Sequence, residues 1–249
     1  MNMKIFYHFF VLIMVLSVGH VFLACHAEKK VKVLIITGGH DYDEARFDQL
    51  LAKLPITYDK VEHPDAFGML TPENIKPYRT VLLYDMPDRI TESAKKDFIA
   101  MLENGTGLVV LHHAVCSYPD WTEYLRIVGG RYAHTEWMKD TIPQPASTYK
   151  HDVEMMVKVG DLEHPVTEGI YDFQIIDETY AHMEILQTVH PLLFTDEPSS
   201  SSLLGWVNRY GNARIFTLTL GHDHQAWENP SFIQILSQAL RWTAEKSGR

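Results

Sequence analysis

Short, almost uninterrupted hydrophobic runs recur through the first half of the chain. Residues 31–37, 80–84 and 108–111 are mostly β-branched and aliphatic, and residues 56–61 show a weaker form of the same pattern. Such runs are typical of strands buried on both faces, as in a parallel sheet. The pattern therefore predicts four strands of one parallel sheet.

Helical patterns lie between these runs. Asp43 and Thr91 each precede apolar residues spaced three and four apart, so both are predicted helix N-caps, and Gly105 is predicted to end the second helix. Strands that alternate with helices at this spacing form right-handed βαβ units. The expected class is α/β.

The second half of the chain is less regular. In order, its patterns predict a helix at 121–128, a long functional loop at 131–150, a strand at 153–159 buried on one face, a hairpin of strands at 203–210 and 214–220 around Gly211-Asn212, and a last helix opened by Asn229-Pro230. No repeat or linker interrupts the chain, so residues 28–249 are predicted to form a single domain.

The first residues have the features of an export signal. Lys4 is the only charge before Glu28, residues 5–23 are almost wholly apolar, and small residues follow. This composition predicts a secretory signal at residues 1–27 and an exported protein. A transmembrane anchor is the alternative, but His8 and His20 interrupt the run.

The end of this segment can be interpreted in two ways. Cleavage after Ala27 would release a periplasmic protein, whereas cleavage before Cys25 would make that residue the lipid-bearing start of an envelope lipoprotein. In both cases Cys116 is left as the lone thiol, so no internal disulfide is expected.

The charge balance excludes some partners. The chain carries 22 basic and 32 acidic residues, a formal net charge of −10, and no Lys/Arg run. Nucleic acids and anionic membrane surfaces are therefore not expected as partners, and a lipid on Cys25 would be the one membrane contact. The sequence leaves the formation of homo-oligomers open.

Titratable residues follow several of the predicted strands. Gly39-His40-Asp41, Asp85, His112-His113 and Gly221-His222 all stand at such positions. Ligands of open α/β sheets bind outside the carboxyl ends of the strands, so we expect these groups to lie at one site. The two glycines at 38 and 39 lack the third glycine of a dinucleotide-binding fingerprint.

Other candidates have structural alternatives. Cys116 is either a nucleophile with a histidine base or a small buried residue. Asp177 and Glu178 are adjacent carboxylates, which on a strand point apart, so one is expected to reach the site and the other to be solvated. Trp121 and Tyr180 are either sugar-stacking platforms or core residues.

A metal ion is a further possibility. Neutral imidazoles with a carboxylate suit zinc or another divalent ion. However, the sequence contains no His-Glu-x-x-His and no paired Cys motif, and the spacing of His40, His113, His134 and His222 is wide.

Several stretches together resemble the ThuA-like proteins linked to trehalose utilisation, over about residues 31–244. They are "ITGGHDYD", "LVVLHHA", "WTEYLRIVGGRYAHTEW", "HPVTEGIYDFQIIDETY" and "IFTLTLGHDHQAW". The resemblance implies a three-layer α/β/α sandwich with a flavodoxin-like, mostly parallel sheet, as in class I glutamine amidotransferases.

Enzymes of that fold place a nucleophilic cysteine on an elbow after a central strand and a catalytic histidine after a later one. Here His112-His113 stand at the elbow and His222 at the later position, so glutamine hydrolysis is not expected. The resemblance implies carbohydrate metabolism, acting on trehalose-like disaccharides or their 3-keto derivatives.

We expect His113, His222 and His112 to be catalytic through proton transfer in isomerisation, elimination or hydrolysis. The expected sugar-binding residues are Gly39, His40, Asp41, Trp121, His134, Glu178 and Tyr180. The alternatives are a non-catalytic carbohydrate-binding protein of the envelope and a hydrolase that depends on Cys116.

Overall fold

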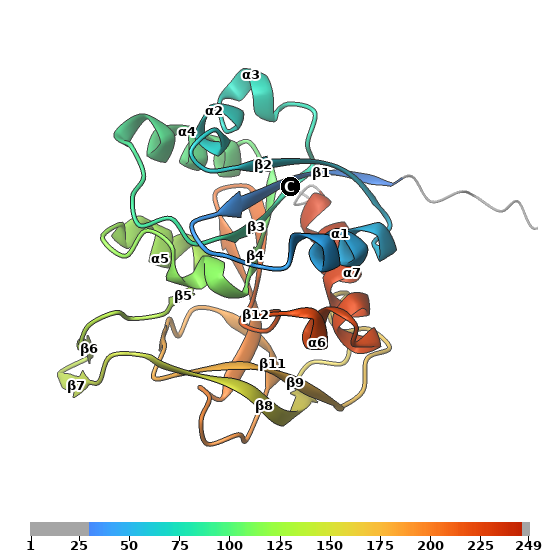
Figure 1. Cartoon of the computed structure of the whole chain (residues 1–249). Helices are drawn as coiled ribbons and strands as arrows, with labels where there is room; N and C mark the ends of the chain where they lie inside the picture. Colours follow the sequence, from blue (N-terminus) through green and yellow to red (C-terminus); the bar gives the residue numbers. More distant parts are fainter. Residues whose placement is uncertain (1–29, 246–249) are drawn as a thin grey trace, which may run out of the picture.

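A nine-stranded sheet runs through the centre of the molecule in the computed structural model, which describes residues 30–245 (Figure 1). The strand order is β2-β1-β3-β4-β13-β12-β11-β8-β9. The signal segment predicted at residues 1–27, with Cys25, lies outside the described residues. None of the helices within residues 30–245 combines the length and apolar character needed to cross a membrane.

The first five strands in this order are parallel and form the core of the fold. They are β2 (Ile56–Glu62), β1 (Val31–Gly38), β3 (Thr80–Asp85), β4 (Gly107–Leu111) and β13 (Ala213–Leu218). The four predicted strands of the first half are confirmed. Successive side chains pack on opposite faces, because Ile35 joins one buried cluster and Leu34 and Ile36 join the other.

Helices cover both faces of this parallel part, which confirms the three-layer architecture (Figure 1). One face carries α1 (Glu44–Lys53), α6 (His224–Trp227) and α7 (Pro230–Ala244), and the other carries α2 (Ala66–Met69), α3 (Pro72–Ile75), α4 (Glu92–Glu103) and α5 (Thr122–Val128). The predicted N-caps are confirmed, since Asp43, Thr91 and Asn229 each accept a backbone N–H of the first turn.

Antiparallel strands extend the sheet beyond β13. They are β12 (Leu203–Tyr210), β11 (His190–Phe194), β8 (Thr148–Val159) and β9 (Phe173–Ala181). The predicted hairpin is confirmed, because Tyr210 pairs with Ala213 across a two-residue turn in which Gly211 has a φ of 55°.

Residues 131–150, which were expected to form a long functional loop, contain several short strands. This stretch contains the hairpin of β6 (Trp137–Lys139) and β7 (Ile142–Gln144), and the end of β5 (Gly130–Arg131), which pairs with β10 (Glu184–Ile185). It also contains the start of β8, five residues earlier than predicted. Its strands are short and largely exposed, so they carry no hydrophobic alternation that a sequence could reveal.

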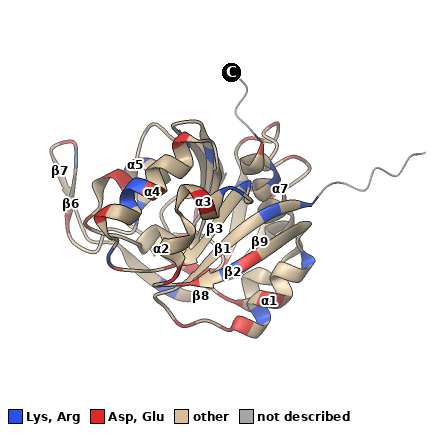
Figure 2. Ribbon diagram, turned by 90° about the horizontal axis from the view of Figure 1, so that it is seen from above, with Lys and Arg blue, Asp and Glu red and all other residues tan. Residues whose placement is uncertain are grey.

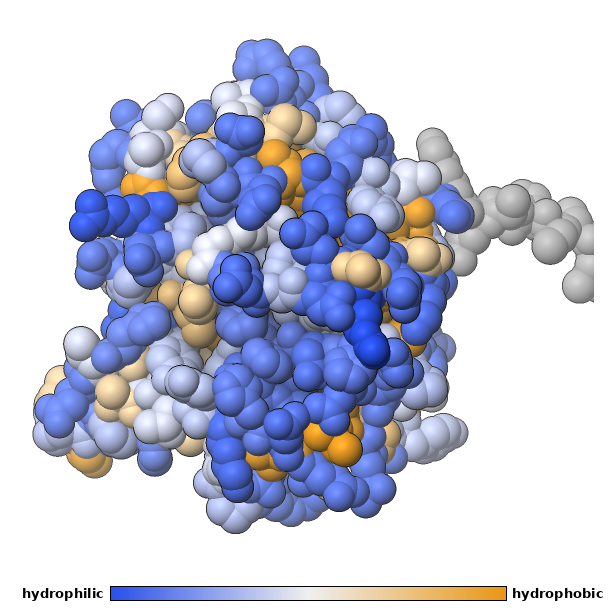
Figure 3. Space-filling model, in the orientation of Figure 1, coloured by the Kyte–Doolittle hydropathy of each residue, from blue (hydrophilic) through white to orange (hydrophobic). Residues whose placement is uncertain are grey.

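Charged residues are mixed over the surface. Lys and Arg are scattered among Asp and Glu over helices and strands (Figure 2). On the face shown in Figure 3, hydrophilic residues dominate and the apolar residues form small separate groups. The surface therefore presents no strongly basic stripe in these views.

Candidate functional site at the carboxyl edge of the sheet

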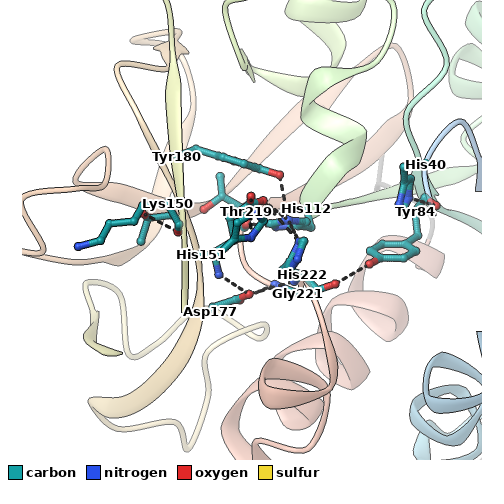
Figure 4. A network of polar contacts seen from close by, with 12 residues as sticks. His40, Tyr84, His112, Lys150, His151, Asp177, Tyr180, Thr219, Gly221 and His222 are labelled. Carbon is teal, nitrogen blue, oxygen red and sulfur yellow. Dashed lines mark hydrogen bonds and ion pairs between the residues drawn. The ribbon is translucent and has the colours of Figure 1, made fainter. Parts of the chain in front are cut away.

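The loops that leave β1, β4 and β13 bring three of the predicted histidines together. The ring centroids of His40 and His113 lie 4.2 Å apart, and those of His113 and His222 lie 5.3 Å apart. The exits of parallel strands meet at one edge of the sheet, and Figure 4 shows His40, His112 and His222 at this edge. The predicted convergence is confirmed.

His112 stands at the centre of the site, directly after β4 and at the start of the 3₁₀ turn η1 (His112–Cys116). Its φ of 50° is unusual for a residue with a side chain, and its ring is fully buried. The Nδ1 atom lies 2.6 Å from the carbonyl oxygen of Thr219. Because a carbonyl only accepts hydrogen bonds, Nδ1 carries the proton, and Nε2 faces the other polar groups of the site.

Glu178 on β9 supplies the carboxylate of the site. Its Oε2 atom lies 2.9 Å from His112 Nε2, and its Oε1 atom lies 3.3 Å from His151 Nδ1. Burial raises the pKa of this carboxyl, but the hydrogen bond and the charge of His112 outweigh burial and leave the pKa below its usual value. Glu178 is therefore ionised at neutral pH.

Asp177 is also buried, so the expectation that one of the two carboxylates is solvated is wrong. Its oxygens accept the backbone N–H groups of Gly221 at 2.6 Å and of His222 at 3.0 Å. Burial raises the pKa of Asp177 to about 6. The two carboxylates point apart as expected of a strand, but both faces of β9 are covered here. Asp177 thus holds the loop after β13, and with it His222, against β9 (Figure 4).

Three imidazoles of the site, those of His40, His113 and His222, are held in the neutral form. Burial lowers the pKa of His113 far below its usual range, and the neighbouring His112 and His40 lower it further. Burial also lowers the pKa of His222 and of His40. The Nδ1 atom of His113 is buried and has no hydrogen-bond partner among the described residues. Neutral rings of this kind offer lone pairs to a proton, a sugar hydroxyl or a metal ion.

A pocket of about 360 Å³ opens onto these groups. Its lining residues are Met86, His113, Cys116, Tyr132, His134, Tyr149, His151, Glu178, Tyr180 and His222. A larger hollow of about 650 Å³ beside α7 has no such cluster of histidines and carboxylates in its lining. The smaller pocket is therefore the candidate site, and its mixed aromatic and polar lining suits a sugar.

Of the predicted sugar-binding residues, His134, Glu178 and Tyr180 line the pocket. The hydroxyl of Tyr180 lies 2.9 Å from His112 Nε2, and His134 Nε2 lies 3.2 Å from the carbonyl oxygen of Cys116. His40 stands one ring behind the lining, against His113. These four residues belong to the site or touch it.

Three predicted sugar-binding residues lie elsewhere. Trp121 is a core residue, packed against Phe98 and Tyr124 beneath α4. Asp41 is exposed and outside the pocket lining. Gly39 has a φ of 86°, and a Cβ there would lie 2.5 Å from the backbone of Met86, so this glycine serves close packing of two loops.

His151 and the tyrosines 132 and 149 were not predicted. A register shift between Lys150 and Val153 interrupts the pairing of β8 with β9, and Asp152 there has a φ of 54°. Such a bulge re-aims a side chain, and here His151 lies against Glu178 and His222. Tyr149 and His151 are two residues apart, so on a strand their side chains lie on the same face. This spacing is the one signal in the sequence that places His151 on the pocket side.

Asp85, which was expected at the site, forms a second, largely buried pair at the same sheet edge with His63, which was not predicted. His63, directly after β2, lies with its Nε2 atom 2.7 Å from Asp85 Oδ2 at the end of β3. Burial raises the pKa of Asp85, whereas the hydrogen bond of His63 opposes this shift. The pair lies outside the pocket lining.

Cys116 borders the pocket but is not activated. It is buried, and burial raises its pKa to about 12, with the charge of Glu178 adding to the shift. The nucleophile is the thiolate, so this thiol is inert at neutral pH. The geometry thus argues against a hydrolase that depends on Cys116.

Four side chains of the site have the composition of a metal centre. One ligand atom from each of His112, His113, Glu178 and His222 lies within 4.8 Å of all the others. These residues could hold a divalent ion.

Comparison with known proteins agrees with this architecture. Residues 32–243 match the family ThuA, described as trehalose utilisation. No curated protein matches the chain.

Solved structures show the same fold. A putative ThuA-like protein from Parabacteroides merdae aligns with a TM-score of 0.73 at 24% identity, over 87% of this chain and 90% of that chain. A second one from Bacteroides uniformis gives 0.66 at 20% identity, over 89% and 95%. PurLQS from Thermotoga maritima gives 0.56 at 12% identity, over 86% and 99%. The fold is therefore the ThuA-like and class I glutamine amidotransferase-like one.

Proposed function

The chain belongs to the ThuA family, which associates it with carbohydrate metabolism, and from this premise we propose an enzyme that acts on trehalose-like disaccharides or their 3-keto derivatives. One observation carries the proposal. Neutral imidazoles and an ionised carboxylate converge in a pocket that is also lined by tyrosines. A binding protein needs the aromatic side chains but not a buried cluster of groups able to move protons.

The proposed step begins with a proton next to a ketone. In a 3-keto sugar the carbonyl acidifies the neighbouring C–H, and His113 stands at the pocket wall as the base that takes this proton. The carboxylate of Glu178 lies within 4.8 Å of a ring nitrogen of His113 and would stabilise the positive charge that the ring gains. His222 also lines the pocket and can donate its free ring N–H to the carbonyl oxygen, whereas His40 lies behind His113. We therefore assign the removal of the C–H proton to His113 and the polarisation of the sugar carbonyl to His222.

Two outcomes follow from the enolate. In an isomerisation, the carbon proton returns to the former carbonyl carbon, and the proton of the neighbouring hydroxyl passes to the former carbonyl oxygen, so that the ketone moves by one carbon. Alternatively the enolate electrons expel the glycosidic oxygen, which leaves with the C–O bond pair and takes up a proton. Addition of water to the resulting double bond then completes a net hydrolysis.

The test uses trehalose, other disaccharides and their 3-keto forms, with products identified by mass spectrometry. We expect turnover of a keto-disaccharide and uptake of deuterium from heavy water next to the ketone. His113→Gln and His222→Ala should each reduce turnover by about 10²–10⁴-fold, the usual contribution of a positioned acid or base. His190→Ala is the matched control, because that exposed ring pairs with Asp161 rather than with the site.

The alternative is a non-catalytic carbohydrate-binding protein. Saturable sugar binding without deuterium uptake or product would favour it. Unaltered turnover in both histidine variants would overturn the mechanism.

Export also belongs to the proposal. The apolar start of the chain supports a periplasmic protein or an envelope lipoprotein anchored at Cys25, with a small carbohydrate as its ligand. The mass of the mature N-terminus distinguishes cleavage after Ala27 from lipid attachment to Cys25, and an uncleaved chain would contradict both.

A further inference from the structure

Three atoms from three separate elements converge at the base of the pocket. His112 Nε2, after β4, lies 2.9 Å from Glu178 Oε2 on β9 and 3.3 Å from His222 Nδ1, after β13. The third side of the triangle, from Glu178 Oε2 to His222 Nδ1, is 3.5 Å. Among these residues the side chains of His112 and Glu178 are buried, and that of His222 is partly open to the pocket.

The three atoms are turned toward one another. The Nδ1–H of His112 donates to the carbonyl oxygen of Thr219, so Nε2 is the ring atom that faces Glu178 Oε2 and His222 Nδ1. The hydroxyl of Tyr180 points at the same group, 2.9 Å from Nε2. Two imidazole nitrogens and a carboxylate oxygen gathered this closely, from three separate elements, are atoms that one cation can join.

We propose that His112, Glu178 and His222 bind a divalent transition-metal ion of the zinc class. Zinc bonds to nitrogen and oxygen of about 2.0–2.2 Å place tetrahedral ligands about 3.3–3.5 Å apart. Two sides of the triangle already have this length, and the third has to lengthen by about 0.4 Å. Two histidines and one glutamate are a ligand set that zinc takes in catalytic sites, where a fourth position stays open.

Groups around the triangle fix its ligands. The Thr219 carbonyl orients His112, His151 lies 3.3 Å from the second oxygen of Glu178, and Asp177 holds the backbone of His222. Partners of this kind set the tautomer and direction of metal ligands. Their presence on every ligand distinguishes this cluster from an accidental group of histidines.

The open position faces the pocket, with His113 beside it. An ion there would accept a sugar or water oxygen and polarise it. This inference goes beyond the proposed function, because metal binding can be measured without any sugar. His113 stays outside the ligand set as the proton carrier.

The test measures metal binding to the full-length chain without an affinity tag. After treatment with chelator and dialysis, Zn²⁺ is titrated against a chromophoric competitor, and bound metal is counted by elemental analysis. Co²⁺ then serves as a spectroscopic probe of tetrahedral nitrogen and oxygen ligation. We expect one ion per chain.

Variants locate the site. His222→Ala and Glu178→Gln should each weaken Zn²⁺ binding by about 100-fold or more, since loss of a mere supporting partner already costs about 10–100-fold. His190→Ala, at an exposed ring that pairs with Asp161, should keep the affinity of the wild type. Circular dichroism and thermal unfolding establish that each variant folds, and His222, the least buried ligand, remains testable if Glu178→Gln does not.

Absence of a stoichiometric ion, or equal binding by the wild type and both ligand variants, would overturn the metal site. Failure of the proposed function gives a different pattern. In that case the ion binds and depends on His222 and Glu178, but no sugar is turned over.

Discussion

The parallel and antiparallel parts of the sheet differ in how they contribute to the site. Strands β1, β3 and β4 are buried on both faces and end in loops that carry His40, His112 and His113. Strand β8 alternates between exposed and buried residues, and β9 does so only over its first half. These strands provide His151 and Glu178 from within their length. The parallel part provides site residues from the loops that follow its strands, whereas the antiparallel part provides them from within strands that border the site.

This difference shows how the fold combines stability with chemistry. The parallel part can carry unfavourable features, such as the positive φ of His112, because helices pack on both of its faces. The antiparallel part has its own irregularity, the bulge before Val153, next to the residue that reaches Glu178. Strain and function therefore lie together in both parts.

The largest expected effect is a difference in the stability that a buried side chain contributes in the parallel and in the antiparallel part of the sheet. Ile35→Ala in β1 should lower the free energy of unfolding by about 2–5 kcal/mol, because the side chain is completely buried. The same change at Ile176 in β9, which is 40% exposed, should change it by about 0.5 kcal/mol or less. Urea unfolding measures both. Equal costs would mean that the β9 face is covered in solution.

The next effect concerns the contact that joins the parts. Asp177→Asn replaces an oxygen acceptor of the Gly221 and His222 N–H groups by an amide donor. We expect a loss of about 1–3 kcal/mol of stability, the cost of an unmatched buried polar group. Asp172→Asn is the control, since Asp172 is exposed and accepts one N–H, from Val159. Similar stability of the two variants would contradict the role of Asp177.

A smaller effect compares the two aromatic residues expected to bind sugar. Tyr180→Phe removes the hydroxyl 2.9 Å from His112 Nε2 and should reduce turnover by about 10-fold, the value of one hydrogen bond of up to about 1.5 kcal/mol. Trp121→Phe should leave turnover and KM unchanged and lower only the thermal stability. A raised KM in the Trp121 variant would restore it as a sugar platform.

The smallest effect is expected at Cys116. Cys116→Ala should leave turnover unchanged, and iodoacetamide should label the native protein slowly, because the thiol is buried and protonated. Mass spectrometry of the labelled chain measures the rate. Fast labelling together with loss of activity would support the cysteine-dependent alternative.

Predictability from the sequence differs between the parts in the same way. Local signals predicted the parallel core with nearly correct strand and helix bounds. These signals are the continuous apolar runs of β1, β3 and β4 and the helix caps Asp43 and Thr91. The hairpin β6–β7 and the early start of β8 carry no such signal. These segments are short and largely exposed, so polar and apolar residues follow one another in them without a strand-like alternation.

The sequence by itself determined the parallel core, the capped helices between its strands and the histidines at strand exits, because burial patterns and caps act over a few residues. Only the tertiary structure decided that Glu178 meets His112 and that His222 completes the triangle. These contacts join residues 66 and 110 positions apart. No local pattern encodes such distances, since they depend on how the antiparallel strands fold back over the edge of the parallel ones.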